Sequence, residues 1–238
     1  MGLEAMMQVR LGDFAKRAAV VLILVATGGP TFADATPPTS GPAPAQPPAE
    51  NATLTLPDMT LGSQKAPINL IEYASMTCPH CAHFDADVFP ELKKNYIDTG
   101  KVFYVFREFP LDGVALRASM VARCMDKTHF FDFIHSLFHT QETWASPEVW
   151  NDKKKPLEQK LTPMANVAKQ QGGLSREQFD KCVNDQAMLQ QIALQAERGR
   201  TDFNVPGTPA IYVDGKFFAQ GNDFMALDAY LKQLLAQK

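Results

Sequence analysis

The sequence has little that would direct it to a membrane or to nucleic acid. Its 23 Lys and Arg residues against 26 Asp and Glu leave a net charge of −3. That balance gives no electrostatic case for a nucleic-acid partner or an anionic membrane surface. The one pronounced apolar run, residues 18–27, is about half of the roughly 20 residues that a spanning helix needs. The chain has only four cysteines.

The N-terminus has the three parts of a secretory signal. Arg10, Lys16 and Arg17 precede the apolar run, and Ala33-Asp34-Ala35 offers the small residues that a signal peptidase accepts. A retained membrane anchor is the alternative, which the shortness of the run disfavours. We therefore expect residues 1–35 to be a cleaved signal peptide and the mature protein to have no stable membrane insertion. In an oxidising compartment its cysteines would be bonded or redox-active.

Residues 36–54 form a Pro- and Ala-rich stretch without apolar periodicity, which predicts a disordered tether. The remaining chain, residues 55–238, fits one domain. The first 35 residues carry equal numbers of acidic and basic side chains, so their removal leaves the net charge at −3.

The apolar pattern of the domain falls into three blocks. Residues 68–75 and 101–109 read as strands that flank a helix starting near Thr77, which Pro90 should kink. Helical periodicity without a strand then fills residues 112–203, with helices expected at 114–127, 130–144, 163–171 and 175–198, the last with a Ser175–Gln178 capping box. Strands return at 210–213 and 216–219 around Asp214-Gly215, a strong hairpin signal, and an apolar helix over 224–235 ends the chain.

The motif Cys78-Pro79-His80-Cys81 stands where the first strand gives way to a helix. The same spacing can form half of a zinc site, so the motif alone is ambiguous. A helix N-terminus presents unpaired amides and a partial positive charge, and His80 can add a donor or a charge. Both would stabilise Cys78 as a thiolate, the nucleophile of disulfide exchange.

This order of elements, with Cys78-Pro79-His80-Cys81, Glu72 and Val205-Pro206-Gly207-Thr208-Pro209-Ala210, resembles the DsbA-like thiol:disulfide oxidoreductases of the bacterial periplasm. The resemblance runs from about Met59 to the C-terminus. It implies an α/β thioredoxin fold with an inserted helical domain, a periplasmic location, and an enzyme that needs no cofactor beyond the Cys78–Cys81 disulfide.

The resemblance also implies roles for individual residues. Cys78 would form the mixed disulfide with a client and Cys81 would resolve it. Glu72, an acidic residue in an apolar strand, would shuttle the proton of Cys81; otherwise it lies on the solvent face of an edge strand. Thr208-Pro209 would be a cis-proline loop that binds extended peptide, although an ordinary turn before the hairpin also fits the sequence.

Partners follow from the same resemblance: reduced secreted proteins as clients, and a membrane or soluble redox protein that reoxidises Cys78–Cys81. A disulfide isomerase or reductase of the same fold remains an alternative, because the residue before the proline is Thr208 where the best-known strong oxidants carry Val. The Pro-rich tether replaces the dimerisation segment usual in isomerases and favours the oxidase.

Cys124 and Cys182 fall in predicted helices of the insertion, and in a secreted chain we expect them to form a structural disulfide rather than two buried thiols. A periplasmic carrier of Cu(I) or Zn(II) that uses Cys78, Cys81 and His83 is the alternative of a different class. A second metal set, Asp132, His135, His139 and Glu142, shares one helix face, for which a solvated polar face is the preferred interpretation. No resident metal is expected.

Overall fold

The computed structural model describes residues 53–220 and 223–238. The expected signal peptide and residues 36–52 of the expected tether lie outside this range. A five-stranded sheet with the order β1-β3-β2-β4-β5 organises the described chain. Its strands are β1 (Met59–Leu61), β2 (Ile68–Ala74), β3 (Val102–Glu108), β4 (Ala210–Val213) and β5 (Lys216–Phe217).

The pairing places β2 in the interior of the sheet. β2 runs parallel to β3 and antiparallel to β4, so Glu72 lies between Phe106 and Ile211. Apolar runs with β-branched and aromatic residues explain these strands. β1 was not expected. Its three residues are too few to show a period, and they pair antiparallel with β3.

The helical segment after β2 alternates between α and π geometry. It comprises α1 (Pro79–His83), η1 (Phe84–Val88), α2 (Phe89–Leu92) and η2 (Lys93–Ile97). Pro90 stands in the first turn of α2, directly after a π segment. Because proline has no N–H to donate, the regular i to i−4 pattern cannot continue through it.

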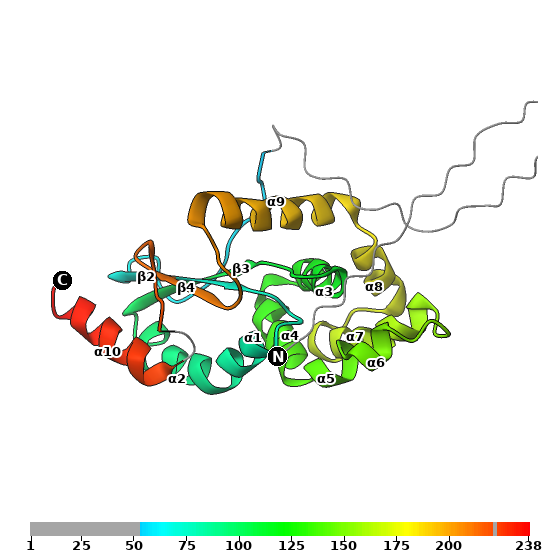
Figure 1. Cartoon of the computed structure of the whole chain (residues 1–238), viewed down its shortest axis with the longest axis horizontal. Helices are drawn as coiled ribbons and strands as arrows, with labels where there is room; N and C mark the ends of the chain where they lie inside the picture. Colours follow the sequence, from blue (N-terminus) through cyan, green and yellow to red (C-terminus); the bar gives the residue numbers. More distant parts are fainter. Residues whose placement is uncertain (1–52, 221–222) are drawn as a thin grey trace, which may run out of the picture. The chain divides into compact units, whose positions relative to one another are not determined.

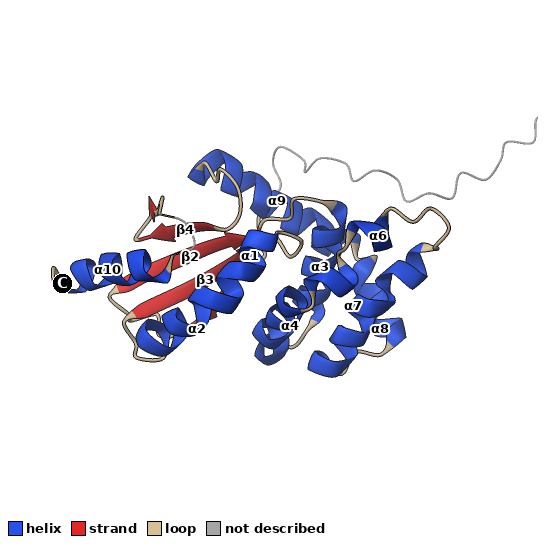
Figure 2. Ribbon diagram, turned by 60° about the horizontal axis from the view of Figure 1, so that its bottom comes forward, coloured by secondary structure: helices blue, strands red, loops and turns tan. Residues whose placement is uncertain are grey.

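Helices fill the chain between β3 and β4, and no strand interrupts residues 113–203. They are α3 (Gly113–Cys124), α4 (Lys127–His139), α5 (Gln141–Trp144), α6 (Pro147–Trp150), α7 (Leu157–Gly172), α8 (Arg176–Val183) and α9 (Gln186–Phe203). In Figure 2 helices α3, α4, α7 and α8 gather beside the sheet. The expected thioredoxin fold with inserted helices is confirmed.

Three expected helix boundaries were wrong. The segment expected at 175–198 is two helices, because the Asp185 side chain accepts the Met188 N–H and starts a new one. The segment expected at 130–144 begins at Lys127, where Asp126 caps it, and is divided after His139. Pro163 lies inside α7 rather than at its start. The Ser175–Gln178 capping box is confirmed.

Both faces of the sheet are covered. In Figure 1 α9 lies along one face, while α1, α2 and α10 (Phe224–Leu235) lie on the other. Side chains alternate along β2, so Tyr73 packs in the cluster under α9, and Leu70 and Ala74 join the larger core that contains Cys81. Glu72 shares the face of Leu70 and Ala74 and therefore points toward α1.

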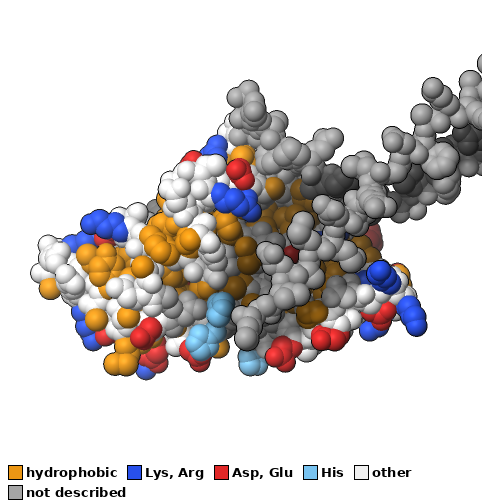
Figure 3. Space-filling view, in the orientation of Figure 1, with side chains coloured by type: hydrophobic (Ala, Val, Ile, Leu, Met, Phe, Trp, Pro, Cys, Tyr) orange, Lys and Arg blue, Asp and Glu red, His pale blue; other side chains and the backbone are white. Residues whose placement is uncertain are grey.

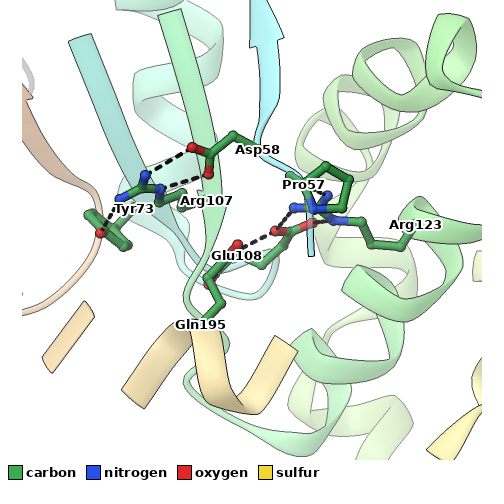
Figure 4. A network of polar contacts seen from close by, with 7 residues as sticks. All are labelled: Pro57, Asp58, Tyr73, Arg107, Glu108, Arg123 and Gln195. Atoms are coloured by element: carbon green, nitrogen blue, oxygen red, sulfur yellow. Dashed lines mark hydrogen bonds and ion pairs between the residues drawn. The ribbon is translucent and has the colours of Figure 1, made fainter. Parts of the chain in front are cut away.

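A polar network fastens the segment before β1 to the domain (Figure 4). Arg107 binds the Asp58 carboxylate and the Tyr73 hydroxyl. The buried Arg123–Glu108 ion pair also involves the Pro57 carbonyl, which accepts from Arg123. Among the described residues, no helix has both the length and the apolar composition to cross a membrane.

Candidate active site

Cys78 occupies the N-cap of α1 and Cys81 lies in its first turn. Both are free thiols, with 6% and 0% of their surfaces exposed. An extended backbone at Cys78 and Pro79 directly after it suit a helix start, because proline lacks the N–H that would be left unpaired there. The motif therefore sits at the strand-to-helix junction expected from the sequence, with one sulfur at the edge of the core and one inside it.

The two sulfurs titrate in opposite directions. A hydrogen bond from the Cys81 side chain is the main cause that lowers the pKa of Cys78 from 9.0 to about 5; burial opposes it, and Thr208 and the amides of Cys81 and His80 reinforce it. Burial, followed by the bond to Cys78 and the charge of Glu72, raises the pKa of Cys81 well above 9.0. At neutral pH the outer sulfur is an anion and the inner one a thiol.

The loop before β4 faces the outer sulfur. The Thr208–Pro209 peptide bond is cis, and the Thr208 carbonyl oxygen lies 3.2 Å from Cys78 Sγ, where it accepts a hydrogen bond from the protonated form of the thiol. The Thr208 hydroxyl is buried, and the Thr208 side chain is one of the groups that lower the pKa of Cys78. The structure thus places Thr208 and Pro209 at the cysteines.

Glu72 lies inside the sheet and 3% of its surface is exposed, which excludes an edge strand facing solvent. The Tyr104 hydroxyl donates to Glu72 Oε2 at 2.5 Å. Burial raises the pKa of Glu72 from 4.5 to about 8, with the Tyr104 hydrogen bond lowering it and the charge of Asp85 raising it. Glu72 is therefore largely a neutral acid at pH 7, and when it is ionised its charge raises the pKa of Cys81.

Two residues that hold the site were missed from the sequence. The Gln141 amide, at the start of α5, donates to the carbonyl oxygens of Met76 at 2.8 Å and Cys78 at 3.1 Å. Asp112 accepts from the Thr77 hydroxyl at 2.6 Å while it caps α3. No sequence pattern signals either contact, because both partners come from segments that only the fold brings together.

The second cysteine pair lies apart from this centre, whereas His80 lies between the two active-site cysteines. Cys124 and Cys182 form a disulfide that joins α3 to α8. His80 is exposed on α1, and on the face seen in Figure 3 histidine side chains lie over α1 beside hydrophobic ones. His83 pairs with Asp87 at 2.7 Å.

Neither set of residues considered for metal binding is assembled. Residues 53–220 and 223–238 contain no group of three or more His, Cys, Asp or Glu side chains that could hold a metal ion. Within the helical set, His135 bonds to Asp85 instead. The carrier alternative gains no support from this arrangement.

The Thioredoxin family model matches residues 54–233 of the chain. The chain belongs to the thioredoxin family. Within that family it is similar to a Rickettsia conorii protein named "Putative protein-disulfide oxidoreductase RC0029", at 36% identity over 159 residues, 66% of this chain and 53% of the relative. The chain thus spans about half the length of the Rickettsia relatives it matches. Disulfide bond formation protein D of Bacillus subtilis is 27% identical over 186 residues, 75% of this chain and 77% of that protein.

Solved structures agree with this family assignment. Alpha-DsbA1 of Wolbachia pipientis superposes with a TM-score of 0.61 at 29% identity, covering 80% of this thioredoxin-family chain and 94% of that one. Oxidised BdbD of Bacillus subtilis shares the fold, with a TM-score of 0.62 at 22% identity over 75% of this chain and 93% of that one. The DsbA-like resemblance drawn from the sequence is confirmed.

Proposed function

We propose that this protein is a thiol:disulfide oxidoreductase that passes the Cys78–Cys81 disulfide to reduced secreted proteins in the periplasm. The observation that carries the proposal is the position of Cys78 at the N-cap of α1 and of Cys81 in its first turn, beside the Thr208–Pro209 loop. The pKa shifts of the two thiols in opposite directions agree with it. The names of the relatives and the DsbA-like neighbours support it. A reduced client and a partner that reoxidises the pair are its two reactants.

The reaction transfers two electrons to the protein in two exchanges. A client thiolate attacks Cys78 Sγ, which breaks the Cys78–Cys81 bond and releases Cys81 as a thiolate. Because Cys81 is stable only as a thiol, it takes the proton of the neutral Glu72 carboxyl. A second client thiolate then attacks the client sulfur of the mixed disulfide, and Cys78 leaves as a thiolate. The client gains a disulfide and the protein becomes a dithiol.

The loop at Thr208 and Pro209 would align an extended client against Cys78. A groove of about 670 Å³ lies next to the neighbours of Cys78 in the chain, lined by residues that include Thr77, Pro79, Gln141 and Pro147. A client strand could therefore lie across Cys78 between the sheet loop and the inserted helices.

The pKa of Cys78 sets the expected direction of exchange. The value of about 5 lies between those of thioredoxin, about 7, and DsbA, about 3.5, whose potentials are about −270 and −120 mV. A stabilised thiolate favours the reduced protein and makes its disulfide oxidising. We expect a potential of about −185 mV, interpolated between these two reference proteins.

Equilibration of the protein with glutathione buffers, followed by thiol trapping and mass measurement, gives this potential. The Cys124–Cys182 pair is scored separately by peptide mapping, and a Cys78→Ser variant supplies the control without exchange. A potential near about −270 mV, the value of thioredoxin, would contradict the oxidase. Recovery of activity from a scrambled disulfide substrate, compared with oxidation of a reduced one, separates isomerase from oxidase.

A further inference from the structure

A cavity of about 630 Å³, lined from β1, η1, α2 and α4, contains a hydrogen-bonded acid–base pair that the proposed exchange leaves unassigned. Asp85 Oδ1 bonds to His135 Nδ1. The Asp85 side chain is 16% exposed and that of His135 is 30% exposed. The pair therefore reaches from the protein interior to solvent.

The inner end of the pair lies near the redox centre. Asp85 follows Cys81 by four residues, so the two side chains project from the same side of the helical segment. After burial and the Tyr104 hydrogen bond, the charge of Asp85 is the next influence on the pKa of Glu72. Two rings lie between Tyr104 and His135: the Phe89 centroid is 5.3 Å from that of Tyr104 and 4.7 Å from that of His135, and the Phe131 centroid is 6.2 Å from each.

We propose that the Asp85–His135 pair is the solvent-side end of the path by which Glu72 exchanges its proton during disulfide exchange at Cys81. The inference rests on the proposed function. After Glu72 has protonated the Cys81 thiolate, its carboxylate regains a proton from His135 by way of Asp85, and His135 takes one from solvent. Rotation of the Asp85 side chain supplies the step toward Glu72. Reoxidation of the pair runs the transfer in the opposite direction.

Few other ionisable groups near Glu72 or in the cavity could carry the proton. Cys81 on α1, Tyr104 on β3 and Asp85 on η1 act on Glu72. The remaining charged residues that line the cavity are Asp58, Lys93, Lys127 and Asp132. Of these, Asp58 is paired with Arg107 and Lys93 with Asp98. The hydrogen bond from His135 makes Asp85 the carboxylate that connects the cavity to the interior.

The test follows a single turnover of the reduced full-length protein with the aromatic disulfide DTNB. The Cys78 thiolate releases one nitrothiobenzoate anion and forms a mixed disulfide. Cys81 then loses its proton, attacks the Cys78 sulfur and releases a second anion. The first phase reports the reactivity of Cys78, whereas the second reports proton removal from Cys81.

His135→Ala should slow the second phase about tenfold between about pH 6 and 8, at the lower end of general acid–base effects, with the first phase changed less than about twofold. Added imidazole should enter the enlarged cavity and restore the second phase in proportion to its concentration. His139→Ala, an exposed histidine one turn further along α4, is the matched control and should leave both phases unchanged. In a Glu72→Gln background, His135→Ala should add no further slowing, because both residues serve one path.

Three outcomes would overturn the proposal: equal slowing of both phases, no response of the His135→Ala variant to imidazole, or the same added slowing in the Glu72→Gln background. Release of two anions by the wild-type protein tests the exchange reaction itself. Failure of the relay and failure of the proposed function therefore give different results.

Discussion

Replacement of Cys81 by alanine should raise the pKa of the Cys78 thiol. The hydrogen bond from the Cys81 side chain is the largest cause that lowers this pKa to about 5. Alanine removes that donor, but leaves the cis Thr208–Pro209 loop and the helix amides in place. The variant therefore isolates one contribution to the thiolate.

The size of the effect follows from the strength of a charged hydrogen bond. A bond to an ionised group contributes about 1.5–3 kcal/mol, and one pH unit of pKa corresponds to about 1.4 kcal/mol. Loss of the donor should thus move the pKa of Cys78 from about 5 to between about 6 and 7. At pH 7 between about a tenth and about a half of the Cys78 sulfur would then be protonated.

The pKa of Cys78 can be measured from the ultraviolet absorbance of the thiolate and from the pH dependence of its alkylation rate. The variant is convenient because Cys124 and Cys182 are bonded, so Cys78 is its remaining free cysteine. Cys81→Ser, whose hydroxyl can still donate, is the control and should stay close to the wild-type value. A Cys78 that still titrates near pH 5 in the alanine variant would refute this reasoning and assign the thiolate to the helix amides and Thr208.

Three further substitutions test the groups beneath and beside the site. Glu72→Gln removes a carboxyl whose pKa is about 8 in the folded protein and 4.5 in the unfolded chain. Between these pH values only the folded protein keeps the proton, so the free energy of unfolding of the wild type should fall by up to about 5 kcal/mol as the pH rises from one value to the other. The free energy of unfolding of the variant, measured in urea, should depend less on pH. If the free energy of unfolding changes with pH in the same way in both proteins, the pKa of Glu72 is not raised by folding. Cys124→Ala/Cys182→Ala opens a loop of separation 58 and should lower the free energy of unfolding by about 4 kcal/mol in the chain-entropy treatment; an unchanged urea midpoint would argue against that stabilisation. Glu108→Gln leaves the Arg123 guanidinium buried without its counter-charge and should cost about 3–5 kcal/mol, visible as a lower Tm, whereas an unchanged Tm would mean that water reaches the pair.

Much of the fold was predictable because its elements are encoded locally. Residues 68–74 and 102–108 carry the apolar β-branched and aromatic runs that β2 and β3 require. β1 escaped prediction because three residues show no period, and its pairing with β3 is a tertiary contact. The division between α8 and α9 was hidden for a different reason. Buried residues recur at helical spacing on both sides of it, and only the Asp185 cap marks the break.

The site was predictable where a residue is conspicuous in its own segment. Two cysteines at a helix start and one carboxyl in an apolar strand are such signals. Gln141 is not, since its bonds to Met76 and Cys78 cross 65 and 63 residues of sequence. Nor is Tyr104, an ordinary aromatic strand residue until the sheet register brings it beside Glu72. Such supporting contacts depend on which helix the fold lays against which strand.

The pKa values of Cys78 and Cys81 are shifted in opposite directions. This difference affects whether the proposed mixed disulfide releases the client oxidised or returns it reduced. A thiol of low pKa is the better leaving group, so attack by a second client thiolate expels Cys78 readily. Return of the client in its reduced form requires attack by Cys81, whose raised pKa keeps it a thiol. Only removal of its proton makes that return fast, and Glu72 is a neutral acid below about pH 8. Under neutral conditions the arrangement therefore favours release of an oxidised client, and a rise in pH through this value should shift the balance toward its return.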